Sequence, residues 1–310
     1  MAELTKKINP LDRHPLVGHE DQLQVLDRGV SERSSAAFIL SGASGIGKRK
    51  AALALAEKYL CQNVQNNKSC GHCPVCQQIR AGQSPSVSFL APVEEMIRVD
   101  EVQKLLHSIH LRSLTPKRFV IIDDVEKMNL QAANTILKTL EEPPEGLYFF
   151  LLTAQISKVL KTIRSRCQVI LFHPLHDDQM RLLFPMTSDE VLEKARGQVG
   201  KTQDLTDVEY QQRFAQCQQF LMDFMKDDFL VQDGGWREFI KNKENFLFLM
   251  ASWEEILLSR WKSKVLSHES GERVDQMLTG MMKIRRQMRF RPDDTLQIES
   301  LWTELRQGES

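Results

Sequence analysis

A glycine-rich turn between an apolar run and a helix-forming run constrains the fold of this chain more than any other feature. Residues 42–48 read GASGIGK and fit the phosphate-loop pattern G-x-x-x-x-G-K, which needs a buried strand before it and a helix after it. The apolar run 36–42 and the Ala- and Leu-rich run 49–61 meet both conditions. The pattern predicts a nucleotide-phosphate site, and an ordinary glycine-rich turn is the alternative. The residues expected to contact the cofactor are Gly42, Gly45, Gly47 and Lys48.

One position departs from this pattern. The residue after the loop lysine is usually Ser or Thr, whose hydroxyl ligates Mg²⁺, but here it is Arg49. A guanidinium removes that ligand and adds positive charge beside the loop. ATP binding therefore stays possible, whereas Mg²⁺ is not expected to be held as in a competent site, and hydrolysis by this chain is expected to be weak or absent.

A second apolar run ends in two carboxylates. Residues 118–124 read RFVIIDD, as expected for a strand buried on both faces. An acidic residue at the end of a strand beside a phosphate loop can hold Mg²⁺ through water, and the next residue often polarises the attacking water. Asp123 and Asp124 are therefore further candidates for cofactor binding.

The distribution of apolar runs predicts an α/β part followed by an all-α part. Strands are expected at 36–42, 118–124, 147–154 and 168–174, with helical segments between them, and this alternation favours a parallel sheet within residues 1–174. A helix between Asn129 and the prolines at 143 and 144 has clear start and stop signals. After residue 174 only helical periodicity remains, in a small module at 175–205 and a larger domain at 206–310.

Composition restricts the classes of function. The apolar fraction is 42 %, the charged fraction is 26 %, and 41 Lys and Arg balance 41 Asp and Glu. These values are typical of a soluble globular protein and give no global sign of nucleic-acid or acidic-membrane binding. No stretch approaches the ~20 apolar residues that cross a bilayer, and the first residues lack a signal-peptide segment. The chain is therefore expected in the cytoplasm, where disulfides are rare.

Four of the six cysteines lie close together in the sequence. Cys61, Cys70, Cys73 and Cys76 have the spacing C-x8-C-x2-C-x2-C, which suits a closed tetrahedral Zn²⁺ site with a structural role. An iron–sulfur cluster also takes four thiolates, and four free buried cysteines are the third possibility. The tight x2 spacings favour structural zinc.

Together with two further segments, these motifs make the chain resemble the clamp-loader subunits of bacterial DNA polymerase III, in the AAA+ ATPase class. Residues 132–144 read AANTILKTLEEPP, similar to the A-A-N-A-L-L-K-x-L-E-E-P-P helix of that family. Residues 163–167 read IRSRC and match its S-R-C motif. Residues 13–19 resemble the segment that packs around adenine in this class.

The resemblance implies an AAA+ domain with a zinc module at 61–76, a helical lid at 175–205 and an oligomerising collar at 206–310. It also implies a hetero-pentamer with gamma/tau and delta subunits that loads a sliding clamp onto primed DNA, without a membrane partner. In that family the arginine of S-R-C contacts the γ-phosphate bound by a neighbouring subunit, and here this residue is Arg166. A small polar residue after the third strand serves as a sensor, and Thr153 has that position.

Within the family, Arg49 and the absence of a long C-terminal extension favour the delta-prime type over the gamma/tau ATPase motor, which is the alternative. A zinc-containing nucleic-acid-binding module is a third possibility, but the cysteine loop carries no aromatic residue for base stacking. A basic group near the C-terminus is interpreted as a subunit seam or a solvated face. Its members are Lys283, Arg285, Arg286, Arg289 and Arg291.

Overall fold

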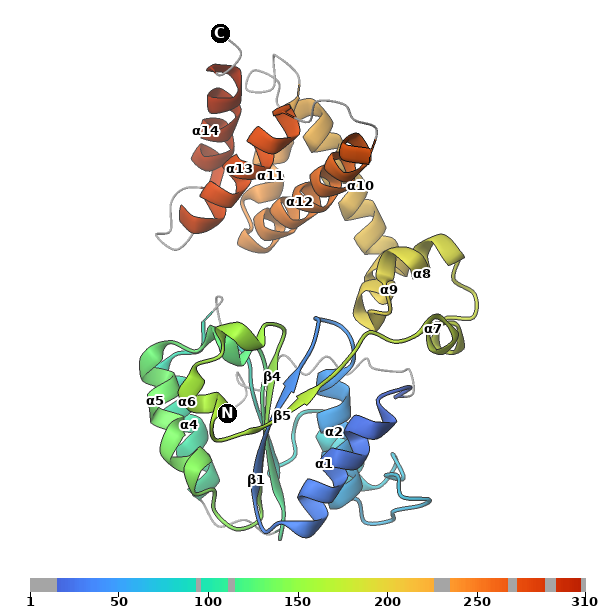
Figure 1. Cartoon of the computed structure of the whole chain (residues 1–310), viewed down its shortest axis with the longest axis vertical. Helices are drawn as coiled ribbons and strands as arrows, with labels where there is room; N and C mark the ends of the chain where they lie inside the picture. The colour runs from blue at the N-terminus through green and yellow to red at the C-terminus, as the bar shows by residue number, and fades with distance from the viewer. Residues whose placement is uncertain are drawn as a thin grey trace. The chain divides into compact units, whose positions relative to one another are not determined.

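A computed structural model of the chain describes residues 16–92, 96–110, 115–225, 235–266, 272–287 and 294–307. Its first part is built on a five-stranded sheet in the order β2-β3-β4-β1-β5 (Figure 1). The strands are β1 (Ala36–Ser41), β2 (Val87–Leu90), β3 (Arg118–Ile122), β4 (Leu147–Thr153) and β5 (Gln168–Leu171). All four pairings between them are parallel, which confirms the predicted parallel α/β sheet.

Four strands lie where the apolar runs predict them. β1 and β4 are buried along their whole length, because helices cover both faces of the sheet, and this burial accounts for their continuous apolar sequences. β2 was not predicted. It has only four residues, VSFL, and lies at the edge of the sheet, so it produces no recognisable apolar run.

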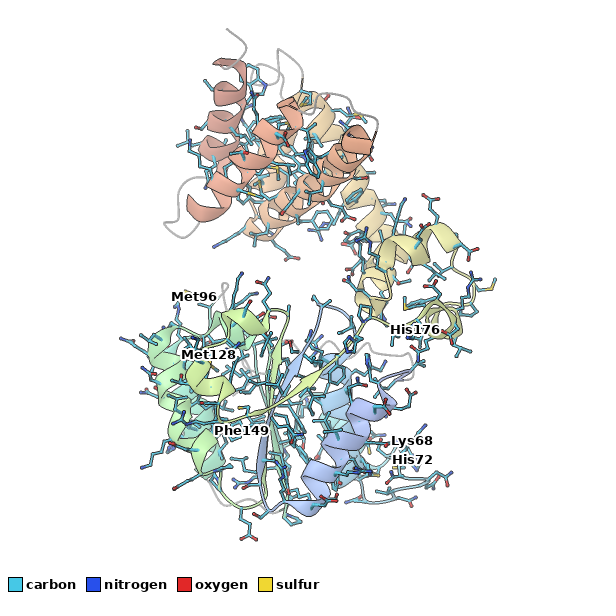
Figure 2. All side chains as sticks on the ribbon, viewed as in Figure 1. Lys68, His72, Met96, Met128, Phe149 and His176 are labelled. Carbon is cyan, nitrogen blue, oxygen red and sulfur yellow. The ribbon has the colours of Figure 1, made fainter. Side chains whose placement is uncertain are left out.

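Helices form a layer on each face of this sheet (Figure 1). One layer contains α1 (Glu20–Glu32) and α2 (Lys48–Leu60), and the other contains α4 (Val99–His110), α5 (Leu130–Glu141) and the short α6 (Lys161–Arg164). Phe149 lies in the core between the sheet and the second layer (Figure 2). The remaining elements are α3 (Pro74–Arg80) and two 3-10 turns, η1 (Val125–Lys127) and η2 (Ile156–Lys158).

The two ends of α5 follow from its sequence. The side-chain oxygen of Asn129 accepts a hydrogen bond from the N–H of Ala132 at 2.7 Å, so the predicted N-cap is confirmed. α5 ends at Glu141, since the prolines at 143 and 144 disfavour helical geometry in the residue before them. α5 therefore presents Glu141 at its carboxyl end.

Three short helices follow the sheet. They are α7 (Asp177–Leu183), α8 (Asp189–Ala195) and α9 (Val199–Thr206), and they share a small apolar cluster that includes Met180 and Leu192. The chain forms two compact units, Met1–Leu205 and Thr206–Ser310, and the three helices belong with the sheet. A separate lid domain at 175–205 therefore stays a prediction.

In the described part of the second unit, every regular element is a helix. It consists of α10 (Val208–Phe224), α11 (Trp236–Ile240), α12 (Lys243–Leu266), α13 (Glu272–Gln287) and α14 (Asp294–Gln307). Two buried tryptophans, Trp236 and Trp253, lie in its core, and the indole N–H of Trp253 donates to the carbonyl of Cys217 at 2.8 Å. Within the described ranges of the whole chain, no helix has the length and apolarity needed to cross a membrane.

The basic group near the C-terminus is only partly covered by the structure. Lys283 lies on α13. Arg289 and Arg291 lie outside the described residues, as do the side chains of Arg285 and Arg286. The interpretation of this group as a seam or a solvated face therefore stays a prediction.

Candidate functional site

The candidate nucleotide residues lie together because parallel strands end at the same edge of a sheet. β4 lies between β3 and β1, with Thr153 beside Ser41 and Leu151 beside Ile122. The N–H of Gly42 donates to the carbonyl of Thr153 at 3.2 Å, so the loop begins next to the end of β4. The structure thus brings the loop, Asp123 and Thr153 to one edge.

The loop turns at its glycines. Gly45 and Gly47 have φ angles of 74° and 100°, in the left-handed region that favours glycine. Gly47 is the N-cap of α2, which begins at Lys48. The strand, turn and helix that the motif requires are therefore all present.

Lys48 points back into the loop. Its Nζ donates to the carbonyl oxygens of Gly42 and Ala43, both at 2.7 Å, and the residue is only 8 % exposed. Burial lowers the pKa of Lys48, whereas nearby carboxylates, Asp123 foremost, oppose this shift. For Lys48 to bind a phosphate chain, phosphate oxygens would have to replace these two carbonyl oxygens as the acceptors of its Nζ–H groups.

The start of α9 rests directly on the loop. The N–H of Gly200 donates to the carbonyl of Gly45 at 2.8 Å. A Cβ atom added at Gly200 would lie 3.0 Å from the Cα of Gly45, so the two backbones approach this closely only because neither residue has a side chain. Sequence reasoning missed this contact, and the glycines in GQVG at 197–200 were the available signal.

The segment before α1 also packs against the loop. His19 is buried, its Nε2 donates to the carbonyl of Ile46 at 2.9 Å, and its ring lies 4.7 Å from that of Phe172. Burial lowers the pKa of His19, which favours the neutral imidazole. Of the segment compared with adenine-binding residues, 13–15 lie outside the described residues.

Arg49 faces the carboxylates at the end of β3. Its Nη1 lies 3.6 Å from Oδ2 of Asp123. Burial raises the pKa of Asp123, and the charge of Arg49 opposes that shift. Asp124 has a φ of 47°, and its Oδ2 accepts a hydrogen bond from Lys127 Nζ at 2.9 Å. Both carboxylates therefore have a cationic partner within the chain. In a hydrolysing site, by contrast, the corresponding carboxylates face Mg²⁺ and water.

Two further groups complete this edge. The hydroxyl of Thr153 accepts a hydrogen bond from the N–H of Gln155 at 3.0 Å, and the residue is 1 % exposed. Glu126, which sequence reasoning missed, accepts from the N–H of Ala154 at 3.1 Å. Its other oxygen is buried without a hydrogen-bond partner among the described residues. A third acidic residue so soon after Asp123 was the signal for Glu126.

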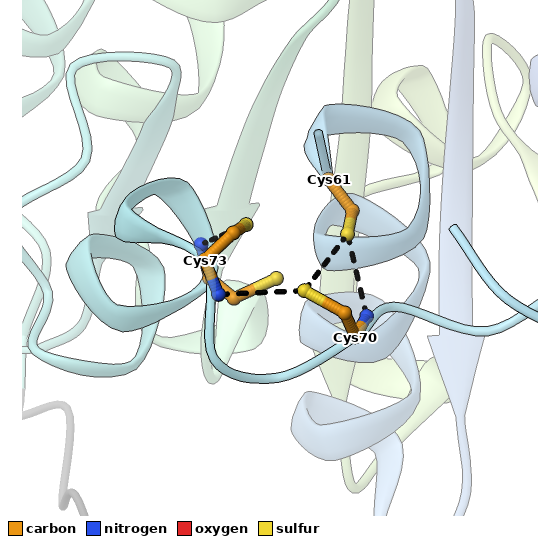
Figure 3. A group of neighbouring side chains, drawn as sticks. Cys61, Cys70 and Cys73 are labelled. Atoms are coloured by element: carbon orange, nitrogen blue, oxygen red, sulfur yellow. Dashed lines mark hydrogen bonds between the residues drawn. The ribbon is translucent and has the colours of Figure 1, made fainter. Parts of the chain in front are cut away.

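The four cysteines come together at the carboxyl end of α2. Their Sγ atoms all lie within 4.8 Å of one another, and those of Cys61 and Cys70 are 3.5 Å apart (Figure 3). Cys61 directly follows α2, whereas Cys73 is the N-cap of α3. A tetrahedral Zn²⁺ with Zn–S bonds of about 2.3 Å separates its sulfurs by about 3.8 Å. The group therefore fits a closed tetrahedral metal site.

Backbone N–H groups point at these sulfurs. Those of Asn63 and Cys70 donate to Cys61 Sγ at 3.3 Å. That of Cys73 donates to Cys70 Sγ at 3.3 Å, and Figure 3 draws this bond together with the one from Cys70. The hydrogen bond from Cys70 lowers the pKa of Cys61, and the one from Cys76 helps to lower the pKa of Cys73 to about 6. Burial raises the pKa of Cys76. Two of the thiols thus favour the thiolate form that binds metal.

A buried carboxylate fastens the cysteine loop to α2. Glu57 accepts from Nε and Nη2 of Arg80 at 2.9 and 3.0 Å, and from the hydroxyl of Ser69 at 2.9 Å. Arg80 also donates to the carbonyl of Gly71 at 3.2 Å. His72 lies exposed on the outer side of the loop (Figure 2) and is not part of the sulfur group.

Arg166 lies two residues beyond α6. Its Nη2 donates to Oε1 of Glu141 at 2.8 Å, its Nη1 donates to the carbonyl of Thr162 at 3.0 Å, and its side chain is 29 % exposed. Among the described residues, no hydrogen bond or ion pair joins Arg166 to the phosphate loop. Arg166 therefore takes no part in the hydrogen bonds and ion pairs that the described residues show for this chain's own candidate nucleotide residues.

Comparison with known proteins points to one family. A family model described as "DNA polymerase III, delta subunit" matches residues 18–176, just over half of the chain. DNA polymerase III subunit delta' (delta-prime) of Pseudomonas aeruginosa is 40 % identical over 134 residues, which are 42 % of this chain and 41 % of that protein. The subunit of the same name from Escherichia coli is 38 % identical over 141 residues, 44 % of this chain and 42 % of that protein. The chain thus spans about two fifths of the length of the curated relatives it matches.

A solved structure resembles the chain over a longer range. It is a DNA polymerase III gamma subunit-related protein from Thermotoga maritima, with a TM-score of 0.62 over 93 % of this chain and 99 % of that one. At 18 % identity this similarity shows the fold alone. It agrees with the α/β architecture followed by helices.

Proposed function

Because the chain belongs to the DNA polymerase III delta-subunit family, we propose that it is a delta-prime-type subunit of a bacterial clamp loader. In this role it joins gamma/tau and delta subunits in a hetero-pentamer that loads a sliding clamp onto primed DNA. Its own ATP hydrolysis is weak or absent, and Arg166 serves the ATP site of a neighbouring subunit. The helical second unit forms the collar of the ring.

The observation that carries this proposal is the pairing of Arg49 with Asp123 at the end of β3. In a hydrolysing phosphate-loop enzyme, the residue after the loop lysine and the acidic residue of this strand both act on Mg²⁺. Here the first is a cation and the second is its partner. Lys48 also donates to carbonyls of its own loop. This set of contacts supports a subunit that keeps the loop as a structural element of the ring.

The role proposed for Arg166 follows from the chemistry of its side chain. A guanidinium is planar, permanently charged and able to contact two oxygens of one phosphate group. Arg166 is partly exposed just after α6, and within the described residues it makes no hydrogen bond to the phosphate loop. These properties support a contact with a nucleotide held by another subunit.

The cysteine group is proposed to bind one Zn²⁺ through Cys61, Cys70, Cys73 and Cys76. Four sulfurs within 4.8 Å of one another fit this ion. When bound, zinc would cross-link the end of α2 to the start of α3 and supply no catalytic chemistry. All four positions of a tetrahedral ion would be taken by protein.

Steady-state ATP hydrolysis by the purified full-length chain distinguishes this proposal from a gamma/tau-type motor. We expect no turnover above the assay background, because Asp123 and Lys48 are engaged within the chain. Turnover of about 1 s⁻¹ or faster, as in competent enzymes, would favour the motor. A Lys48→Ala variant is the control. If this variant shows the same ATP hydrolysis as the wild type, the activity comes from a contaminant.

A further inference from the structure

We propose that Glu141 is the positioning residue for Arg166: its carboxylate holds the guanidinium in the orientation in which it meets a neighbouring subunit's nucleotide. The inference rests on the proposed function of Arg166. Its starting point is the ion pair between Arg166 Nη2 and Glu141 Oε1, at 2.8 Å. This pair joins the last residue of α5 to the turn after α6.

The contacts of Arg166 fix the plane of its guanidinium. Nη1 donates to the carbonyl of Thr162 at 3.0 Å and lies 3.4 Å from the hydroxyl oxygen of Ser165, while Nη2 donates to Glu141. Nε is buried without a partner among the described residues. Of the five N–H groups of an arginine, two thus have no acceptor in the described part of the chain, the buried Nε–H and one on Nη2. The one on Nη2 is the group available to an external oxygen.

Glu141 suits this role because its backbone belongs to a rigid element. The residue before it, Leu140, is 3 % exposed and lies in the same apolar cluster as Ile163 of α6. α5 and α6 are therefore packed together through the core beneath the ion pair. Glu141 thus contacts the side chain of Arg166 from a helix end that the core holds in place.

The ion pair is well suited to hold Arg166 without sequestering it. The side chains of Arg166 and Glu141 are 29 % and 57 % exposed, so water screens their attraction. Pairs of this kind change an equilibrium by about two- to fivefold. A nucleotide phosphate, with more charge, can therefore share or replace the carboxylate as a partner.

The first test measures the order of Arg166 in the purified full-length chain by ¹⁵N relaxation of its Nε–H group. Its burial protects the Nε proton from exchange with water. We expect an order parameter close to about 0.8 in the wild type and below about 0.6 in Glu141→Ala. Glu142→Ala is the matched control, since Glu142 is the adjacent exposed carboxylate, and it should leave the value unchanged. Equal order in wild type and Glu141→Ala would overturn the proposal.

The second test measures clamp- and DNA-stimulated ATP hydrolysis by clamp loaders reconstituted with each variant. Glu141→Ala should lower kcat about two- to fivefold at the site that Arg166 serves and leave KM for ATP unchanged. In an Arg166→Ala background, Glu141→Ala should cause no further loss, because it acts through Arg166. A loss that persists in that background would assign Glu141 another role and overturn the proposal.

The two failures can be told apart in the same series. If Arg166→Ala lowers kcat and Glu141→Ala does not, the positioning role of Glu141 is wrong while the proposed function stands. If Arg166→Ala itself has full activity in an assembled complex, the proposed role of Arg166 is wrong, and the role of Glu141 falls with it.

Discussion

At the scale of single residues, Arg49 is where this chain departs from the phosphate-loop pattern. The loop keeps its glycine turn and its lysine, but Arg49 replaces a hydroxyl ligand and pairs with Asp123 at 3.6 Å. The pair is partly exposed and contributes at most about 1 kcal/mol to stability. In the proposed function its role is chemical, because it adds positive charge where a hydrolysing site places Mg²⁺.

The contact between the loop and α9 gives a prediction at this scale. Gly200→Ala would place a methyl group 3.0 Å from the Cα of Gly45, so α9 must shift away from the loop. We expect the free energy of unfolding to fall by about 1–3 kcal/mol, as for other overpacked sites, measured by urea denaturation of the full chain. Met186→Ala, at a position 97 % exposed, is the control. An unchanged denaturation midpoint for Gly200→Ala would show that this contact does not contribute to stability.

Sequence reasoning found part of this edge and missed the rest for a physical reason. The residues that were predicted belong to short local patterns, either one turn or the end of one strand. They include Gly45, Lys48 and Asp123. The contact of Gly200 with Gly45 joins segments far apart in the chain, and the glycines at 197–200 do not by themselves identify Gly45 as the partner. Glu126 lies within a 3-10 turn that has no characteristic periodicity.

At the scale of elements, α2 connects the loop to the cysteine group. It begins at Lys48, and Cys61 follows its last residue. Glu57, on the last turn of α2, ties the cysteine loop through Arg80 and Ser69. The spacing of the cysteines predicted a metal site. The contacts of Glu57 could not be predicted, because Arg80 and Ser69 come close to it only when the loop is folded. β2 was missed because four residues at a sheet edge give too weak a pattern.

Removal of one thiol tests the proposed zinc site at this scale. The wild-type chain should contain one equivalent of zinc by elemental analysis, and Cys73→Ser should lose it and unfold at a lower temperature, since metal binding contributes folding free energy. Cys167→Ser removes a thiol outside the sulfur group and should keep the zinc. Wild-type protein without zinc, or with the absorption of an iron–sulfur cluster, would contradict the assignment.

At the scale of the whole molecule, two units carry separate parts of the proposed function. The first unit holds the sheet, the loop, the sulfur group and Arg166, and the second has its own core around Trp236 and Trp253. The change from alternating strands and helices to helices alone was readable from the sequence, because apolar periodicity reports which face of an element is buried. Contacts with other subunits leave no such pattern within one chain.

The proposed place in a ring is tested most directly by ATP hydrolysis of reconstituted clamp loaders, measured with the clamp and DNA present. Three complexes are compared, which contain the wild-type chain, Arg166→Ala or Lys161→Ala. Lys161 is an exposed cation on α6, and it is a cleaner control than Arg164, whose guanidinium donates to the carbonyl of Ile156.

Arginine fingers contribute about 10³–10⁵ in rate at the site they serve. The loss in total activity should be smaller, because the other sites of the ring stay intact. We predict a clear decrease in kcat for Arg166→Ala alone, with assembly unchanged. Equal kcat for all three complexes would contradict the proposal that this chain completes a neighbour's ATP site.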